Sequence, residues 1–286
     1  MTIYRGISNP SGITAGPDGA MWFTSPGINS IGRITTTGVV TEYTGAGISA
    51  PKGIAAGPDG ALWFTNPGNN SIGRITTSGA VTNYTGTGIS DPTAIAAGPD
   101  RTLWFTNFSN NSIGRITTSG VVTNYTGTGI SFPDAIATGS DGALWFGNFS
   151  GKSIGRISTT GTVTDYTGSG INVPLDIAAG PDGALWFTNG NSIARITTAG
   201  VVTKYKGPGI YAPYIIAAGP DGAMWFANRN EKSIHRITMT GVLTPFGLTD
   251  CGGDSEQGFG GIAAGPDSAV WFTCFTSNAI GRITAG

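Results

Sequence analysis

A ten-residue segment recurs along the chain and limits the folds that the chain can adopt. The segment reads GPDGALWFTN at 57–66 and again at 180–189, and GPDGAMWFAN at 219–228. Looser copies at 16–25, 98–107, 139–148 and 265–274 bring the total to seven, each with one tryptophan. Successive tryptophans are 41, 41, 41, 41, 39 and 46 residues apart. A period of about 40 residues with short apolar runs is typical of a β-propeller, in which each repeat forms one four-stranded blade.

The second repeat contains the four strands that we expect in every blade. Its strand-length runs are GIAAG (53–57), ALWFT (61–65), SIGRITT (71–77) and AVTNYT (80–85). Residues that favour tight turns fill the joins, and no helical period is present. The 48 glycines follow no Gly-X-Y period and fit a chain with many turns. The sequence therefore predicts an all-β fold, a seven-bladed propeller of four-stranded antiparallel blades that forms one domain over residues 1–286.

The two ends of the chain complement each other. The last residues, AIGRITAG, correspond to the third strand of a blade, and no fourth strand follows. The first residues, MTIYRG, align with the fourth-strand segment VVTKYKG at 201–207. We therefore expect the N-terminal strand to join the last blade and close the ring, which leaves no internal sheet edge unpaired.

Four residue types occupy the same place in every repeat. We expect the tryptophan and the phenylalanine of each repeat to fill the space between neighbouring sheets. One aspartate in the first turn and one arginine in the third strand recur in equal number, which predicts a structural contact between them or a turn cap. These residues are Asp18, Asp59, Asp100, Asp141, Asp182, Asp221 and Asp267, with Arg33, Arg74, Arg115, Arg156, Arg195, Arg236 and Arg282. None of them is expected to be catalytic.

Differences between the repeats gather in the loops of one face. The loops that lead into first strands and those that join second to third strands share the face where propellers usually bind ligands. Aromatic residues in these loops predict a pocket for a small or cyclic ligand, and the alternative is that they cover blade ends. They are Phe132, Tyr211, Tyr214 and Phe259 in the first set of loops and Phe108, Phe149 and Phe275 in the second. Polar residues of the same face, each a candidate contact or a solvated charge, are Lys52, Asp91, Asp134, Asp176, Arg229, Glu231, Asp250, Asp254 and Glu256.

The insertion before the last blade contains one of the two cysteines. Cys251 lies in it, and Cys274 follows the tryptophan of the same blade on a loop of the same face. We predict a disulfide between them, which favours an oxidising compartment. The acidic residues of the insertion lack the spacing of a known cation-binding loop, so the sequence predicts no metal site.

The repeat GPDGALWFTN…NSIGRIT…G.VT.YT resembles the virginiamycin B lyases, a family also called streptogramin B lyases, over essentially the whole chain. The resemblance implies a seven-bladed propeller. It also implies a possible activity, the linearisation of a cyclic depsipeptide antibiotic by metal-assisted elimination, with magnesium as the cofactor. That chemistry needs a base of suitable pKa and a cation that stabilises the developing negative charge.

The residues that the family uses for this chemistry are replaced here. The family's histidines lie in PH[AG]I at the start of the last two blades, where this chain has Tyr214 and Gly260. Gly258 stands where the resemblance places one glutamate, and the glutamate of WFTE is Asn in five repeats, Ser25 in the first and Cys274 in the last. The resemblance thus implies the fold without the family's catalytic residues.

The remaining features narrow the choice of partners. The sole histidine, His235, lies in a third strand outside the loop face and is expected to be structural. A net charge of −1 without a basic run argues against nucleic acid, and no apolar stretch is long enough to span a bilayer. The N-terminus lacks the features of a signal peptide. The compartment stays open, with secretion favoured over the cytoplasm.

Three functions remain open from the sequence. The favoured one is non-catalytic binding of a glycan, a polymer or a small cyclic ligand by a monomer without a cofactor, at the loop face or at repeated sites between blades. The repeated version would use the asparagines that follow the tryptophan segment, whose alternative role is to turn the next loop: Asn66, Asn107, Asn148, Asn189 and Asn228. The second function is a divergent lyase with Tyr214 or a loop carboxylate as base and Glu256 as a replacement magnesium ligand. The third is a repeat-amplified scaffold without a ligand.

Overall fold

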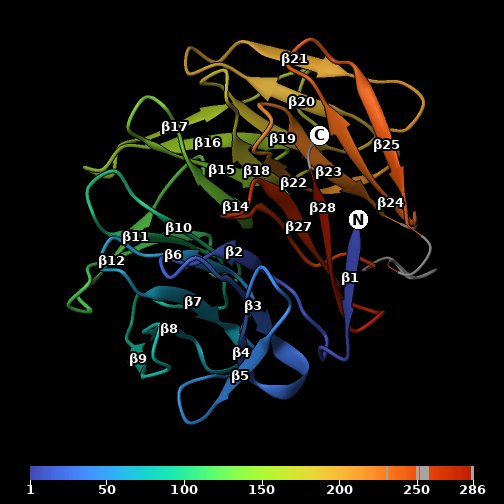
Figure 1. Ribbon diagram of the computed structural model, residues 1–286. Coiled ribbons are helices and arrows are strands. Elements are labelled where there is room, and N and C mark those ends of the chain that lie inside the picture. Colours follow the sequence, from blue (N-terminus) through green and yellow to red (C-terminus); the bar gives the residue numbers. More distant parts are fainter. Residues whose placement is uncertain (230, 249–250, 252–257, 285–286) are drawn as a thin grey trace.

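Seven antiparallel sheets of four strands surround a central axis. The computed structural model describes residues 1–229, 231–248, 251 and 258–284, and all seven sheets lie in this part of the chain (Figure 1). The first strands of neighbouring sheets contact one another all the way round, so they are the innermost strands. None of the described helices is long or apolar enough to cross a membrane. The seven-bladed propeller expected from the sequence is confirmed.

The strands follow one another within each sheet from the axis outwards. The first three complete sheets contain β2 (Ile13–Ala15), β3 (Met21–Ser25), β4 (Ser30–Ile34) and β5 (Val40–Thr44); β6 (Ile54–Ala56), β7 (Leu62–Asn66), β8 (Ser71–Ile75) and β9 (Val81–Thr85); β10 (Pro92–Ala97), β11 (Leu103–Asn107), β12 (Ser112–Ile116) and β13 (Val122–Thr126). Single turns of 3-10 helix, η1 (Pro26–Ile28) and η2 (Pro67–Asn69), join the second and third strands of the first two.

The next three sheets repeat this plan. They contain β14 (Pro133–Thr138), β15 (Leu144–Asn148), β16 (Ser153–Ile157) and β17 (Val163–Tyr166); β18 (Pro174–Ala179), β19 (Leu185–Asn189), β20 (Ile193–Ile196) and β21 (Val202–Tyr205); β22 (Pro213–Ala218), β23 (Met224–Asn228), β24 (Ser233–Ile237) and β25 (Leu243–Gly247). Below, the blades are numbered one to seven from the sheet of β2 to the sheet of β26.

The seventh blade combines both ends of the chain. Strands β26 (Ile262–Ala264), β27 (Ala269–Cys274) and β28 (Ala279–Thr284) form its inner part, and β1 (Thr2–Arg5) pairs with β28 as the outer strand (Figure 1). The register runs from Thr2 opposite Arg282 to Arg5 opposite Ala279. Closure by the N-terminal strand, as expected from the sequence, is confirmed.

Apolar side chains fill the spaces between neighbouring blades. Between blades one and two, for example, Trp22 and Ile31 of one sheet pack with Leu62 and Phe64 of the next. Each of the seven tryptophans is fully buried in a cluster of this kind. The prediction that the repeated aromatic residues form the core is confirmed.

The third strand carries glycine where it passes under the repeated phenylalanine. In blade two, Phe64 lies opposite Gly73, and a Cβ atom on Gly73 would come within 2.1 Å of the phenylalanine ring. The glycine therefore lets the ring lie flat on the neighbouring strand. In blade six His235 takes this place, and its ring stacks on Phe226 with the centroids 5.1 Å apart.

The repeated aspartate accepts hydrogen bonds from both the tryptophan and the arginine of its blade. In blade two, Trp63 Nε1 lies 3.0 Å from Asp59 Oδ1, and Arg74 Nε lies 2.6 Å from Asp59 Oδ2. Burial acts to raise the pKa of Asp59, but the bonds from Trp63 and Arg74 outweigh it, so the net pKa is lowered. All seven repeats contain both contacts. The predicted Asp–Arg contact is confirmed, and it fixes the first turn of each blade to the third strand.

Candidate functional site

A central cavity opens where the loops enter the innermost strands. Its volume is about 590 Å³. One position of the repeat, two residues before the first strand or the second residue of that strand, contributes to the lining in every blade. This position carries a different residue each time: Ser11, Lys52, Thr93, Asp134, Leu175, Tyr214 and Gly260. The scaffold is thus repeated sevenfold, while the cavity that it surrounds has no sevenfold symmetry.

The wall of the cavity is apolar and polar in nearly equal parts. Isoleucines of the innermost strands line it, among them Ile54, Ile95 and Ile136. Prolines at the starts of the loops, Pro26 and Pro67, add to the rim. A cavity that combines apolar side chains with a few convergent polar groups is a usual form of small-molecule site.

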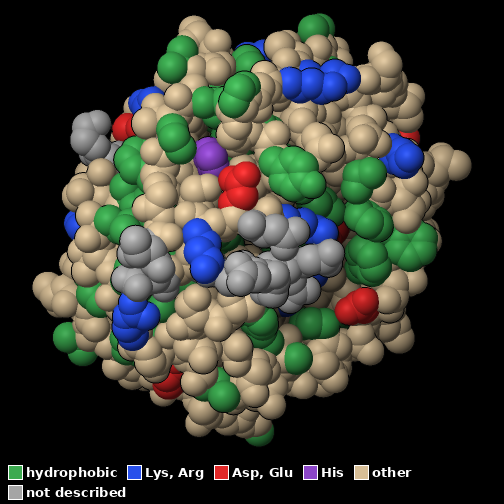
Figure 2. Space-filling view, turned by 90° about the vertical axis from the view of Figure 1, so that its right-hand side faces the viewer, with side chains coloured by type: hydrophobic (Ala, Val, Ile, Leu, Met, Phe, Trp, Pro, Cys, Tyr) green, Lys and Arg blue, Asp and Glu red, His purple; other side chains and the backbone are tan. Residues whose placement is uncertain are grey.

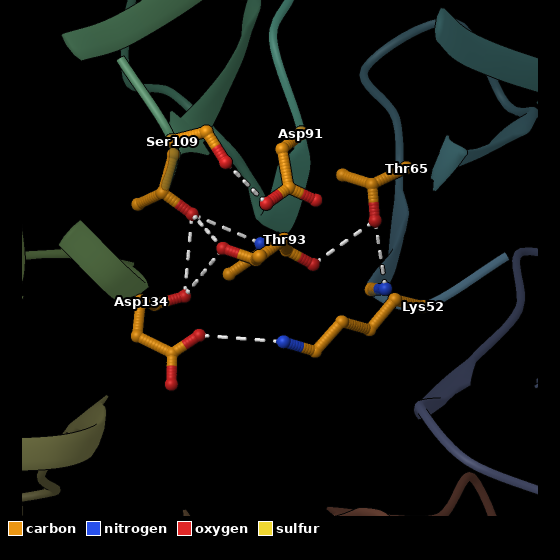
Figure 3. A network of polar contacts seen from close by, with 9 residues as sticks. Lys52, Thr65, Asp91, Thr93, Ser109 and Asp134 are labelled. Atoms are coloured by element: carbon orange, nitrogen blue, oxygen red, sulfur yellow. Dashed lines mark hydrogen bonds and ion pairs between the residues drawn. The ribbon is translucent and has the colours of Figure 1, made fainter. Parts of the chain in front are cut away.

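One ion pair crosses an entire blade at the rim. Lys52 of blade two and Asp134 of blade four point toward each other past Thr93 of blade three, as Figure 3 shows, with 3.4 Å between Nζ and Oδ1. Because the Lys52 side chain is 49% exposed, solvent screens the pair, and we expect it to contribute at most about 1 kcal/mol. The ion pair instead fixes the positions of two opposite charges at the mouth of the cavity.

Threonines of the second strands bind the rim of one blade to the next. Thr65 Oγ1 accepts a hydrogen bond from the backbone N–H of Gly53 at 2.8 Å and donates one to the carbonyl of Thr93 at 3.0 Å (Figure 3). Thr24 and Thr106 donate in the same way to the carbonyls of Lys52 and Asp134. Thr273 donates to the carbonyl of Ser11 and so joins the seventh blade to the first.

We expect Thr65→Val to lower the free energy of unfolding by about 2 kcal/mol, because two buried backbone groups lose their partner. Valine keeps the shape of threonine, so the loss comes from the hydroxyl. Urea denaturation followed by tryptophan fluorescence would measure the change. Thr82→Val on the exposed part of β9 is the matched control and should change the unfolding free energy by less than about 0.5 kcal/mol. Equal effects of the two substitutions would contradict the linking role of Thr65.

Asp176 is a carboxyl group held between blades five and six. Its oxygens accept hydrogen bonds from the backbone N–H groups of Ile177, at 2.9 Å, and of Ile216 in the next blade, at 2.8 Å. It lines the cavity, so its exposed surface faces the cavity rather than the outer surface. Burial raises its pKa to about 7, the two backbone bonds oppose this, and the charge of Asp134 adds to it. Asp176 therefore changes charge near neutral pH.

Tyr214 lies beside this carboxyl group and beneath a guanidinium group. The Arg229 Cζ atom is 4.7 Å from the centroid of the Tyr214 ring, which is cation–π geometry. Burial raises the pKa of Tyr214, and the nearby charges act in both directions. A raised pKa makes the phenolate harder to form, so Tyr214 is poorly suited to act as a base.

The aromatic candidates divide into two groups. Tyr214, Phe259 and Phe275 line the central cavity together with Lys52, Asp134 and Asp176. Phe108, Phe132, Phe149 and Tyr211 lie outside its lining; the first two form an edge-to-face pair with centroids 5.3 Å apart, and the other two are exposed. Figure 2 shows one face of the molecule, where hydrophobic side chains gather on the right and charged side chains lie around the centre. Asp250, Asp254 and Glu256 lie outside the described residues.

The predicted disulfide is present. Cys251 is bonded to Cys274 at the end of β27, with the two Cα atoms 5.4 Å apart. Both cysteines are fully buried and pack with Phe259, which lines the cavity. The bond therefore ties the insertion to the blade whose start forms one side of the mouth.

The repeated asparagines are part of the scaffold. Asn66 is fully buried, accepts a bond from the N–H of Ser49 at 3.0 Å and donates to the carbonyl of Gly47 at 2.8 Å. The same two backbone contacts recur at the other four asparagines. Because these amides hold the preceding loop, they are not placed to bind a ligand at seven repeated sites.

The sole histidine also has a structural environment. His235 is 4% exposed, and its Nε2 atom lies 3.2 Å from Asn228 Nδ2 and 2.8 Å from Ser233 Oγ. Burial lowers its pKa, which the neighbouring Glu231 partly offsets. His235 is not part of the cavity lining.

Both the sequence and the fold of this chain are similar to those of known proteins. The sequence profile of the virginiamycin B lyase family matches residues 2–209 and 171–286. This chain belongs to the virginiamycin B lyase family. A streptogramin B lyase structure shares 33% sequence identity with it and has a TM-score of 0.90, over 98% of this chain and 96% of the other. A catalytically inactive histidine-to-alanine variant of virginiamycin B lyase from Staphylococcus aureus, solved with quinupristin, shares 33% identity with a TM-score of 0.90, over 100% and 99% of the chains.

More distant matches bear on the fold alone. The WD40 propeller domain of Doa1 has a TM-score of 0.79 at 12% identity, over 100% of this chain and 96% of the other. The search of curated proteins gives no match.

One of the two positions where the family resemblance places a histidine has no room for a side chain. A Cβ atom on Gly260 would lie 2.6 Å from the Cα atom of Ser11 and 3.0 Å from Thr273 Oγ1. Backbone cannot yield as a flexible side chain does, so a histidine would require the first blade to move. The other position holds Tyr214, whose ring is already stacked under Arg229.

The described residues do not fit the magnesium ion that the family resemblance implies. Among the residues that the structure describes, no group of three or more histidine, cysteine or acidic side chains could hold a metal ion. Both carboxylates of the cavity already have partners, Asp134 in Lys52 and Asp176 in two backbone N–H groups.

Four lining residues of the ring were not among the candidate binding residues from the sequence: Ser11, Thr93, Leu175 and Gly260. The sequence does contain evidence for them, because they occupy the same position of the repeat as Lys52 and Tyr214. Comparing that one position across all seven repeats would have found them.

Proposed function

We propose that this chain binds a small molecule in the central cavity and does not carry out histidine-dependent elimination. The observation that carries the proposal is the ring of seven different residues around one cavity of about 590 Å³. A repeat-amplified scaffold would have no physical reason to differ at this position while it keeps its core residues in all seven blades. A single asymmetric site also accounts for the lining better than repeated sites between blades, whose five asparagines are buried.

The catalytic part of the proposal is supported by the residues that replace the histidines. In the Staphylococcus aureus virginiamycin B lyase, a histidine-to-alanine variant is catalytically inactive. Here Tyr214 and Gly260 take the histidine positions, and His235 lies outside the cavity lining. The binding surface would then remain from the family scaffold without the base that elimination requires.

Binding of the neutral fluorescent dye N-phenyl-1-naphthylamine tests the proposal. We expect saturable fluorescence enhancement with one site per chain, and loss of at least about tenfold in affinity in Thr93→Trp, whose indole would fill the cavity. Thr82→Trp, on exposed β9, adds the same ring elsewhere and should leave the affinity unchanged. Dye binding that is absent, or equal in both variants, would contradict a ligand site in the cavity.

A second function, metal-independent elimination by a divergent lyase, is favoured by one observation. Asp176 lies at the cavity with a pKa raised to about 7, which suits a general base near neutral pH. Incubation with quinupristin, with and without magnesium, followed by mass spectrometry would decide between the two. Our first proposal expects no linearised product above the buffer control. A product formed by the unmodified chain and absent with Asp176→Asn would establish the second function instead.

A further inference from the structure

A second, smaller cavity adjoins the central one between blades five and six. Its volume is about 240 Å³, and it lies between the loops that lead into β18 and β22. Leu175 lines both cavities. Tyr214 of the central cavity stacks against Arg229 of the second one, so these two side chains stand at the junction. One ligand could therefore occupy both spaces.

Arg229 brings a positive charge that the described part of the protein does not neutralise. Its Nε atom is buried and has neither a hydrogen bond nor an ion pair with any residue that the structure describes. Stacking on Tyr214 holds the plane of the guanidinium group in one orientation. A guanidinium group fixed in this way can donate two parallel hydrogen bonds to one anionic group.

The other polar side chains among the described residues that line the second cavity are amides, and none of these lining residues is acidic. Asn191 uses its Oδ1 atom to accept the N–H of Ala212 at 3.2 Å, which leaves its Nδ2 atom as a donor. Asn172 Nδ2 lies close to Gly190, since a Cβ atom there would be 2.9 Å away. Amide N–H groups beside a guanidinium group favour a negatively charged ligand over a neutral or positive one.

Below pH 7, where Asp176 holds its proton, the central cavity opposes a negative charge at this junction only weakly. The carboxylate of Asp134 is paired with Lys52. The carboxyl group of Asp176 is desolvated and shares its two oxygens with backbone N–H groups. The isoleucines and prolines of the wall would receive the uncharged body of the same ligand.

We propose that the ligand is an apolar organic acid whose body lies in the central cavity and whose anionic group binds Arg229 and the neighbouring amides in the second cavity. The inference rests on the proposed function, because it assigns a chemical class to the ligand of that site. Arg229 acts as the residue that selects for the charge.

Two dyes that share one ring system test the charge preference. 8-Anilino-1-naphthalenesulfonate is the sulfonated form of N-phenyl-1-naphthylamine, so the pair differs in one anionic group. We expect the unmodified chain to bind the sulfonate at least about tenfold more tightly than the neutral dye, since a desolvated charge-assisted pair strengthens binding. In Arg229→Met this preference should disappear, because the affinity for the sulfonate should fall to about the affinity of the same variant for the neutral dye.

Two further variants separate charge from structure. Arg101→Met, in the exposed turn at the far end of β10, removes the same charge and should keep the full preference. Arg229→Lys should keep part of it, because a lysine retains the charge without the paired donors. Equal binding of the two dyes by the unmodified chain, or an undiminished preference in Arg229→Met, would overturn the anion site while the cavity proposal stood. Failure of the neutral dye to bind at all would count against the proposed function itself.

Discussion

The unmodified chain is expected to lose about 3 kcal/mol more of its free energy of unfolding between pH 5 and pH 9 than the Asp176→Asn variant loses over the same range. The cause is the position of Asp176, whose pKa is raised to about 7 by burial, above its value of 3.8 in an exposed setting. Between these values the folded chain holds a proton that the unfolded chain has released. The folded state is therefore favoured at low pH in this window, and it loses this advantage as the pH rises through 7.

Urea denaturation across this pH range would measure the effect as a difference between two curves. The difference matters because His235 acts in the opposite direction: its lowered pKa makes the folded state less stable below the ordinary histidine value of 6.5. His235 is present in both proteins, so its contribution cancels. Asp165→Asn, on the exposed strand β17, is the matched control and should follow the unmodified curve. Parallel curves for Asp176→Asn and the unmodified chain would contradict a protonated Asp176.

The fold could be predicted almost completely because its rules are local and repeated. Every blade has a tryptophan and a phenylalanine for the core and an aspartate that fixes the first turn, so seven copies give the same information seven times. A glycine lies beneath the phenylalanine ring in five blades, and Ala194 and His235 replace it in blades five and six. The exceptions are instructive. At the glycine position of blade six, His235 is accommodated by stacking on Phe226, a replacement that the repeat pattern does not foresee.

The site was only partly predictable, because loop membership does not say where a side chain points. Phe132 and Tyr214 both lie near the same kind of proline, yet Phe132 precedes it and Tyr214 follows it. Phe132 is exposed and lies outside the cavity lining, whereas Tyr214 lines the cavity. Asp176 was a candidate as a loop charge, but its buried position depends on the N–H of Ile216 in the next blade. Contacts between blades of this kind cannot be read from one repeat.

Closure of the ring affects both the stability of the fold and the shape of the cavity. The cavity is asymmetric because each blade contributes its own residue, and the blades keep their places only if the seventh is fastened to the first. The hydroxyl of Thr273 and the strand β1 both make that connection, one near the axis and one at the outside. Loss of the outer connection should therefore affect both stability and ligand binding.

Removal of residues 1–6 is expected to lower the free energy of unfolding by at least about 5 kcal/mol, the largest effect that we predict. The deletion removes β1, exposes the edge of β28 and uncovers Trp271, against which Tyr4 stacks at 5.5 Å with the rings 5° apart. Tyr4→Ala alone should cost about 3 kcal/mol, since it removes the stacked ring and leaves the strand. Calorimetry and urea denaturation would measure both changes.

Tyr43→Ala in β5 separates ring closure from the loss of an aromatic pair. Tyr43 stacks on Trp22 with the centroids 5.4 Å apart, as Tyr4 stacks on Trp271, but its strand continues directly from its own blade. Each of the two substitutions removes one stacked ring and leaves its strand in the sheet. Tyr43→Ala should therefore lower the free energy of unfolding about as much as Tyr4→Ala. The deletion should cost clearly more than either, since it alone opens the ring. A deletion no more harmful than Tyr4→Ala would mean that the N-terminal strand adds only a ring to cover Trp271, and that the other contacts between blades seven and one suffice to keep the propeller closed.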